Sequence, residues 1–352
     1  MRAQMKAAWW LVALASFWLS ATALADGPPR LQVDPSWPKP LPHGWVLGEV
    51  SGVAVDAADH VWIIQRPGRV AGAKRAPAVI EFDPSGGVLR SWGGPGRGYD
   101  WFHSEHGINI DPNGFVWLGG NGARDGQVLK FTQDGKFLLQ IGHPAEGAAS
   151  NDVTRLSRPA DVAVDPVAHE VYVADGYGNR RIIVFDSETG AYKRHWGAYG
   201  GRPSDAAQHY DPKAEAPRQF GRPVHCVKLA RDGLVYVCDR QNDRVQIFHK
   251  DGSFVAEWLL APNTVGMGSV WDLALWPDAA QSLLFNADGS NEQVRVLRRA
   301  DGMVLGAFGH AGRKPGEFHW VHSIAVDSHG DVFTTEVDHA NRVQRFVPSV
   351  AP

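Results

Sequence analysis

Short runs in which apolar and polar residues alternate make up most of the chain, and turns rich in Asp and Gly separate them. Residues 224–260 are the clearest example, with the runs "VHCVKLA", "LVYVCD", "RVQIFHK" and "SFVAEWLL". A period of two is typical of β-strands, and Asp and Gly favour the tight turns of antiparallel hairpins. We therefore expect a four-stranded antiparallel sheet in this segment.

The same unit occurs six times along the chain. Equivalent first strands start at intervals of 46 to 65 residues, and the third strands repeat a pattern such as "RIIVFD" or "RVQIFH". The six first strands begin at Ser51, His106, Ala160, His225, Trp271 and His322. Six such units predict an all-β fold, a six-bladed β-propeller.

The sixth unit ends after its third strand, at Pro348, and lacks an outer strand. The alternating segment "RLQVD", at residues 30–34, precedes the first unit. We expect this N-terminal strand to complete the sixth blade, because ring closure leaves no sheet edge exposed. The longest connection, Tyr199–Phe220, is expected to lie over one face of the disc.

The first residues carry a targeting pattern. Arg2 and Lys6 precede an apolar run, and "ALA" at residues 23–25 is typical of a cleavage site. The pattern predicts a secretory signal peptide over residues 1–25, followed by the propeller domain over residues 26–352. An uncleaved anchor is the alternative, although the run is short for a membrane span. We expect a periplasmic or secreted protein with no membrane span after signal cleavage.

The composition changes this picture little. The 35 Lys and Arg nearly balance the 38 Asp and Glu, and no long basic run occurs. This balance argues against nucleic acid or an anionic membrane as the main partner. The 39 Gly, 23 Pro and 14 Trp suit an all-β protein with many turns. We expect a monomer.

The six strand starts form a ring, because the first strand of each blade lines the propeller channel. Histidine takes the second, fourth and sixth places, as His106, His225 and His322. Alternate blades are related by about a third of a turn, so the three imidazoles converge on the axis. Three histidines with one open position are the ligand set of catalytic zinc. The ring predicts a site for zinc or another divalent transition metal, whereas any one of these histidines alone would indicate only a polar residue.

The turns after the second strands are expected to lie above this ring. They contain Arg66, Tyr177, Arg240 and Glu336. An arginine can hold a carboxylate, and a tyrosine near a cation can ionise and act as a base. We interpret Arg240 and Glu336 as turn residues that are polar because they are exposed.

The two cysteines fall in one predicted hairpin. Its turn at Arg231–Gly233 places Cys226 directly opposite Cys238. Cross-strand neighbours are close enough for a disulfide, and an exported protein meets an oxidising compartment. A disulfide and two packed thiols are both compatible with this pattern.

Several of these segments resemble the catalytic core of peptidyl-α-hydroxyglycine α-amidating lyase, a six-bladed propeller with NHL-like repeats. The resemblance covers nearly the whole expected mature chain. The NHL-like repeats are generic, whereas the three histidines together with the Asp-Gly-Tyr turn are specific. The segments that carry it are "WVLGEVSGVAVD", "EHGINID", "RPADVAVDP", "VADGYGNRRI", "PVHCVKLA" and "VHSIAVD".

The resemblance implies roles for individual residues. By their motifs, His106, His225 and His322 match the ligands of a catalytic zinc. Tyr177 matches the residue that removes a substrate proton, and Arg66 matches one that helps to hold the substrate. Enzymes of this family cleave an N-acyl-α-hydroxyglycine into a primary amide and glyoxylate. The resemblance therefore implies a metal-dependent lyase that acts on a small hydroxylated amide or a peptide-like substrate.

One position departs from the family pattern. The family carries an aspartate directly after the third histidine, where it helps to hold a structural calcium, and this chain has Ser323. Asp272 and Asp161 occupy the equivalent place in two other blades and form a second candidate metal site, for calcium.

Two other functions compete with the lyase. The main alternative is an NHL-repeat binding or scaffold protein in which the histidines hold a structural metal. A calcium-dependent lactonase, also six-bladed, is less favoured because such sites use carboxylates and asparagine rather than three histidines.

Overall fold

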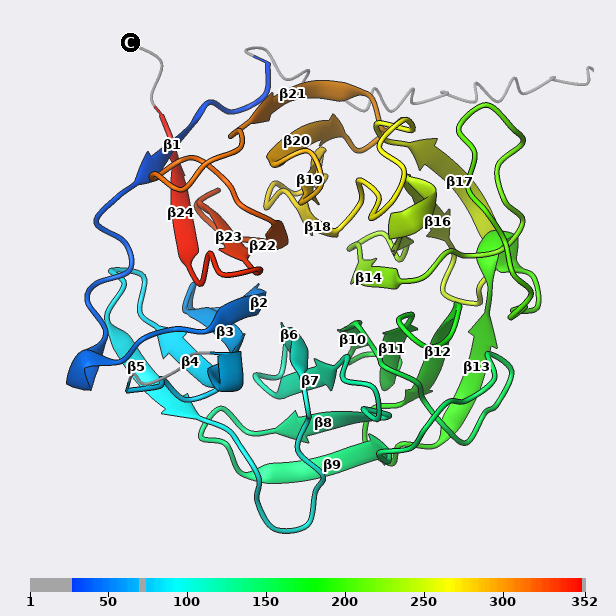
Figure 1. Ribbon diagram of the computed structural model, residues 1–352, viewed down its shortest axis with the longest axis horizontal. Helices are drawn as coiled ribbons and strands as arrows, with labels where there is room; N and C mark the ends of the chain where they lie inside the picture. The colour runs from blue at the N-terminus through cyan, green and yellow to red at the C-terminus, as the bar shows by residue number, and fades with distance from the viewer. Residues whose placement is uncertain (1–26, 70–73, 350–352) are drawn as a thin grey trace, which may run out of the picture.

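Six four-stranded antiparallel sheets surround a common axis in the computed structural model (Figure 1). The structure describes residues 27–69 and 74–349. The expected signal peptide, residues 1–25, lies outside this part. Within it, no helix is both long enough and apolar enough to cross a membrane.

In blades one to three the strands run in chain order from the axis outward (Figure 1). Blade one contains β2 (Glu49–Val55), β3 (Val61–Arg66), β4 (Val79–Phe82) and β5 (Val88–Trp92). Blade two contains β6 (Glu105–Ile110), β7 (Val116–Gly120), β8 (Gln127–Phe131) and β9 (Phe137–Gly142). Blade three contains β10 (Asp161–Asp165), β11 (Glu170–Asp175), β12 (Arg181–Asp186) and β13 (Tyr192–Trp196).

Blades four and five repeat this order, and blade six is assembled from both ends of the chain. Blade four contains β14 (Val224–Leu229), β15 (Val235–Asp239), β16 (Arg244–Phe248) and β17 (Phe254–Leu259). Blade five contains β18 (Asp272–Leu275), β19 (Leu283–Asp288), β20 (Gln293–Arg298) and β21 (Val304–Phe308). Blade six contains β22 (Val321–Val326), β23 (Val332–Glu336), β24 (Val343–Pro348) and β1 (Leu31–Asp34). The described residues also form four 3-10 helices, which are η1 (Pro42–Gly44), η2 (Pro67–Arg69), η3 (Ala198–Gly200) and η4 (Arg240–Asn242).

The N-terminal strand closes the ring. β1 pairs antiparallel with β24, from Leu31 opposite Pro348 to Asp34 opposite Arg345. The predicted six-bladed propeller and its closure by residues 30–34 are therefore confirmed.

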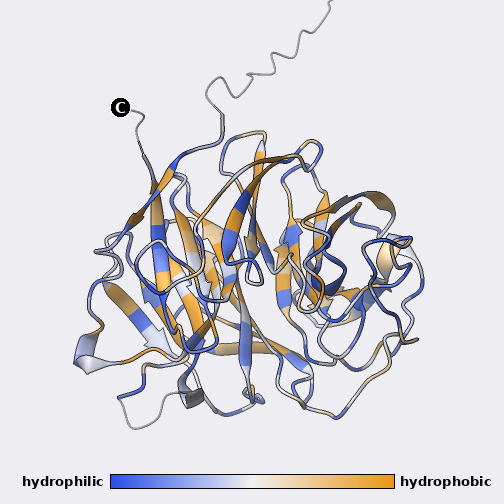
Figure 2. Ribbon diagram, turned by 45° about the horizontal axis from the view of Figure 1, so that its top comes forward, coloured by the Kyte–Doolittle hydropathy of each residue, from blue (hydrophilic) through white to orange (hydrophobic). Residues whose placement is uncertain are grey.

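The hydrophobic core lies between the blades. In β15, Val235 and Val237 pack toward blade three, whereas Tyr236 and Cys238 pack toward blade five. Successive side chains of a strand point to opposite faces, so an inner strand buries both faces. Figure 2 shows hydrophobic residues concentrated along the strands. Six such clusters, one at each blade interface, fix the positions of the inner strands.

Buried ion pairs tie the second strand of a blade to the third. Asp175 at the end of β11 and Arg181 at the start of β12 lie 2.9 Å apart, and neither side chain is exposed. Asp239 and Arg244 repeat this pair in blade four at 2.7 Å, again without exposure. These pairs hold the connection between the two strands, which is the region expected above the histidine ring.

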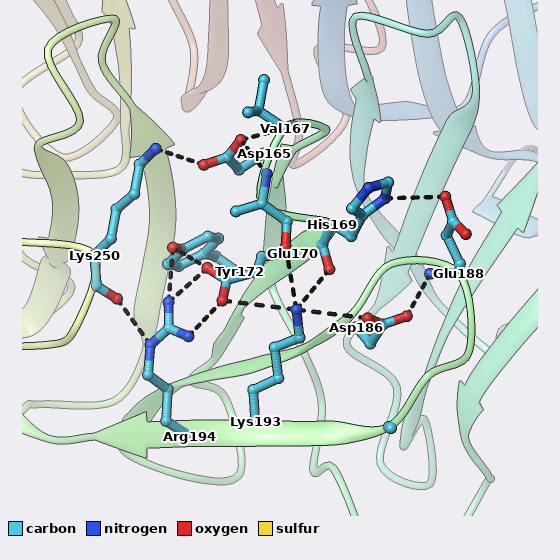
Figure 3. Close-up of polar contacts among 12 residues, drawn as sticks. Asp165, Val167, His169, Glu170, Tyr172, Asp186, Glu188, Lys193, Arg194 and Lys250 are labelled. Carbon is cyan, nitrogen blue, oxygen red and sulfur yellow. Dashed lines mark hydrogen bonds and ion pairs between the residues drawn. The ribbon is translucent and has the colours of Figure 1, made fainter.

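A polar network holds the opposite end of blade three (Figure 3). Arg194 donates to both carboxylate oxygens of Glu170 at 2.6 Å, and the Tyr172 hydroxyl donates to the same carboxylate. Lys250, from the β16–β17 turn, forms an ion pair with Asp165. The network therefore joins blade three to blade four.

Candidate metal centre

The three ring histidines meet at the axis. His106, His225 and His322 are each the second residue of an inner strand, and all three are at most 3 % exposed. Their ligand nitrogens all lie within 4.8 Å of one another. The structure thus brings together the three residues that the repeat pattern selected.

A break in strand register accompanies each histidine. The pairing of the inner strand with the second strand shifts between Val224 and Cys226, and likewise between Val321 and Ser323. A similar shift spans Glu105 to Ile108. β-bulges re-aim side chains, which explains how residues of a twisted strand can point at the axis. The alternation of apolar and polar residues does not reveal these bulges.

The remaining blades supply the partners of the imidazoles. His106 Nδ1 donates to the Ala160 carbonyl at 2.8 Å, and His322 Nδ1 donates to the Ser51 carbonyl at 2.7 Å. His225 Nδ1 is bonded to the Trp271 carbonyl. A carbonyl only accepts, so each Nδ1 carries the proton and each Nε2 keeps its lone pair. Each histidine therefore bonds to the ring residue of the following blade.

Burial keeps these histidines neutral. Together with the charges of Arg66 and Arg240, it lowers the pKa of His322 to about 3. Burial also lowers the pKa of His106 and of His225 well below the ordinary value. Three neutral imidazoles with free Nε2 lone pairs are a donor set that suits zinc and other divalent transition metals. The residues therefore fit a metal of this class.

Tyr177 lies directly over the ring. Its hydroxyl is 3.0 Å from Nε2 of His106 and 3.1 Å from Nε2 of His225. The turn that carries it approaches the backbone of blade four closely, since a Cβ on Gly176 would lie 1.9 Å from the Val224 oxygen. Only glycine permits this approach, so the Asp-Gly-Tyr sequence positions the hydroxyl.

Arg240 is a second group that faces the ring. It is 4 % exposed, its guanidinium lies 4.3 Å from the Trp271 ring, and Nη1 donates to the Tyr177 hydroxyl at 3.4 Å. Burial lowers its pKa, and among the described residues its Nε has no hydrogen-bond partner. A buried guanidinium without a carboxylate partner is a receptor for an anionic ligand.

Our interpretation of Arg240 and Glu336 as exposed turn residues is therefore wrong. Glu336 is fully buried and pairs with Arg342 at 2.6 Å, so its role is structural. Both residues are buried because neighbouring blades cover a turn that faces the axis. The residue pattern within one blade does not reveal this burial.

Arg66 ends β3 at the edge of the site. It donates to Glu49 at 2.8 Å, to the Glu105 carbonyl at 2.8 Å and to Asn121 at 3.4 Å. Its charge contributes to the lowered pKa of His106 and of His322, which places it near the ring. Unlike Arg240, it is already held by three protein acceptors.

The two carboxylates that we expected to hold calcium also lie close together. Lys228 Nζ lies 2.9 Å from Asp161 and 2.9 Å from Asp272. An ammonium between two carboxylates occupies the position that a divalent cation would need and repels such a cation. These residues do not fit a calcium ion.

The cysteines form a disulfide within blade four. Cys226 of β14 pairs with Cys238 of β15, the register that the turn predicted, and a bond joins their sulfur atoms.

One small cavity adjoins the ring, and a larger one lies beside η4. A cavity of about 10 Å³ lies against the three histidines and is also lined by Asp161, Asp272 and Ser323. A larger one of about 490 Å³ is lined by the long connection at Gln208–Pro212 and by Gln241 and Asn242, which follow Arg240. The expectation that this connection covers part of one face agrees with its place beside η4.

The fold and the repeats define the class of protein. Residues 156–185 match the family model described as NHL repeat. The chain is thus a six-bladed β-propeller that carries an NHL repeat. The streptogramin B lyase structure is similar in fold, with a TM-score of 0.55 and 13 % identity over 91 % of this chain and 98 % of that one.

Its named relatives are more specific. Peptidyl-glycine alpha-amidating monooxygenase B of Xenopus laevis is 29 % identical over 92 % of this chain and 36 % of its own length. Peptidyl-alpha-hydroxyglycine alpha-amidating lyase 1 of Drosophila melanogaster is 26 % identical over 86 % of this chain and 57 % of its own. NHL repeat-containing protein 3 of Homo sapiens is 26 % identical over 90 % of this chain and 84 % of its own. The chain spans about a third of the length of the monooxygenases that it matches.

Proposed function

We propose that this protein is a metal-dependent lyase that cleaves a small hydroxylated amide of the N-acyl-α-hydroxyglycine type. One observation carries the proposal. Three neutral imidazoles meet at the axis, and next to them lie a tyrosine hydroxyl and a buried guanidinium that has no carboxylate partner among the described residues. The similarity to proteins named as amidating lyases supports the same reaction class.

His106, His225 and His322 would hold the metal, and zinc is the ion that suits them best. Bound there, a zinc ion would supply Lewis acidity to the hydroxyl oxygen of the substrate. The carbonyls that accept from Nδ1 would keep the imidazoles oriented toward the axis.

Tyr177 would act as the base. Its oxygen lies within hydrogen-bond distance of two Nε2 atoms, so a hydroxyl bound at the ring would lie next to it. When the tyrosine removes the hydroxyl proton, the carbon–oxygen double bond of glyoxylate forms and the carbon–nitrogen bond breaks. The amide nitrogen takes up one proton in return, so the products are the primary amide and glyoxylate.

Two arginines would hold the carboxylate end of the substrate. Arg240 is the stronger candidate, because its Nε has no partner in the described structure. Arg66 would add a second positive charge at the rim, consistent with the role that the resemblance implies. The acyl group would extend toward the cavity of about 490 Å³, which is lined by Gln241 and Asn242, the two residues that follow Arg240.

We further propose that the protein works in the periplasm or is secreted, as a monomer, on a small-molecule or peptide-like substrate. The signal-peptide pattern of residues 1–25 and the Cys226–Cys238 disulfide support an oxidising compartment. The ring closed by β1 supports a monomer, since blade six gains its fourth strand from the same chain.

The competing function is that of a binding or scaffold protein with a structural metal. It is favoured by the similarity to NHL repeat-containing protein 3, which covers most of both chains. In that case a metal would be present and Tyr177 would have no chemical task.

Metal content and turnover of α-hydroxyhippurate, measured together, test the proposal. We expect stoichiometric zinc and release of glyoxylate from the wild-type protein, and stoichiometric zinc without glyoxylate from Tyr177→Phe. Tyr192→Phe, which alters an exposed tyrosine on β13, is the matched control and should retain turnover. Zinc without glyoxylate in the wild type would favour the scaffold function, and a folded protein that binds no metal at the ring would overturn the site.

A further inference from the structure

A lysine from blade four reaches the two buried carboxylates of its neighbouring blades. Lys228 Nζ contacts Asp161 of β10 in blade three and Asp272 of β18 in blade five, each at 2.9 Å. Both aspartates are at most 6 % exposed. One ammonium thus links three consecutive blades.

Further hydrogen bonds extend this link around the channel. The second oxygen of Asp272 accepts from the Ser323 hydroxyl at 2.7 Å and from the Ile324 amide at 3.0 Å. The Ser323 hydroxyl in turn accepts from the Val53 amide of blade one at 3.3 Å. We call Asp161, Lys228, Asp272 and Ser323 the polar belt. It joins five of the six blades.

The polar belt lies between two cavities. Asp161, Asp272 and Ser323 line the cavity of about 10 Å³ below the histidines. Lys228 lines another of about 180 Å³, together with residues near the far ends of the inner strands, such as Ile110 and Leu275. The polar belt therefore lies between the cavity at the histidines and the far ends of the inner strands.

Electrostatics keep the lysine charged in this position. Burial alone would lower the pKa of Lys228, but the charges of Asp161 and Asp272 outweigh burial and raise it above the ordinary value. Burial raises the pKa of Asp161, and the charge of Lys228 opposes that shift. The carboxylates and the ammonium thus compensate one another without any added ion.

We infer that the Lys228 ammonium is a built-in cation that performs the blade-linking task of a bound calcium ion. Ser323 fits this arrangement, because an aspartate at this place would add a third negative charge next to Asp272, whereas a serine donates a hydrogen bond to it. The role of Lys228 does not depend on whether the protein is a lyase.

Calcium titration of the wild-type protein, purified with its metal, is the first test. We expect no stoichiometric calcium by elemental analysis, no heat of binding and no change of the unfolding temperature in millimolar calcium chloride. One tightly bound calcium ion whose removal lowers the unfolding temperature would overturn the inference.

Removal of the ammonium is the second test. Lys228→Ala leaves Asp161 and Asp272 facing an open space, so its unfolding temperature should be lower than that of the wild type and should rise by several degrees with calcium. Lys228→Met fills the space with an apolar chain and should be destabilised without a response to calcium. Asp272→Asn in the Lys228→Ala background should abolish the response.

A failure to fold is also informative. If Lys228→Ala folds only when calcium is present during refolding, the exchange of ammonium for calcium is supported directly. If it folds as stably as the wild type and ignores calcium, the lysine is not a structural cation and the inference fails. If it folds under neither condition, the wild-type titration decides.

Discussion

At the scale of single residues, the two nitrogens of each ring histidine have separate tasks. Nδ1 donates to a carbonyl of the next blade and Nε2 faces the axis. Loss of one imidazole therefore removes a ligand and also leaves a buried carbonyl without its donor. Because all three rings share one site, no single member is redundant.

His322→Ala should abolish stoichiometric metal binding while the propeller remains folded. Two nitrogen ligands do not complete the three-histidine set that an open tetrahedral site requires. Elemental analysis after gel filtration would measure the loss, and circular dichroism would check the fold. His195→Ala, on the outer strand β13, is the control and should retain metal. Full metal content in His322→Ala would show that the ring does not bind the ion.

Gly176→Ala should impair catalysis without removing the tyrosine. The new Cβ would lie 1.9 Å from the Val224 oxygen, so the turn that carries Tyr177 must move. Displacement of a catalytic group by about 1 Å costs on the order of 100-fold in rate. Glyoxylate release under single-turnover conditions would measure this fall in rate. The control is Gly306→Ala, where the nearest atom lies 3.6 Å away, and equal rates in both variants would contradict the positioning role of the turn.

Arg240→Gln should act on substrate binding rather than on metal content. The loss of a charge-assisted contact to the carboxylate should lower kcat/KM about 100-fold. The effect should be small for a substrate whose carboxylate is converted to an amide, because that substrate offers no charge to bind. Arg218→Gln, an exposed arginine on the long connection, serves as the control. Equal losses of kcat/KM for the charged and the neutral substrate would show that Arg240 has a structural role instead.

At the scale of elements, strand alternation predicted the blades but not their contacts with one another. The third-strand pattern that begins with Arg181 or Arg244 marked the repeat, and the structure shows the reason, since each arginine neutralises an aspartate at the end of the preceding strand. The ring histidines could be found because they share a position in the repeat. The burial of Arg240 and the contacts of Lys228 could not be predicted, because both depend on residues of other blades that are distant in the sequence.

Arg244→Met should destabilise blade four strongly. It would leave the carboxylate of Asp239 buried without its cation, and breaking one side of such a pair costs about 3–5 kcal/mol. Urea unfolding, followed by tryptophan fluorescence, would measure the change in the free energy of unfolding. Arg298→Met, which removes an exposed arginine paired with Asp301, should change stability little. If both variants unfold at the same urea concentration, the buried pair contributes no more than a surface pair.

At the scale of the whole molecule, closure of the ring by β1 determines where blade six sits, and blade six carries His322. Removal of residues 1–36 would expose β24 as an open sheet edge and remove Leu31 and Val33 from the core of blade six. We expect the free energy of unfolding to fall by an amount on the order of 3 kcal/mol, because apolar burial and strand pairing are lost together, and we expect self-association through the free edge.

A protein that lacks only residues 1–26 is the control. Thermal unfolding and light scattering would report both effects, and a peptide of residues 27–36 added in trans should reverse them by pairing with β24. A truncated protein that stays monomeric and equally stable would show that β1 does not close the ring in solution.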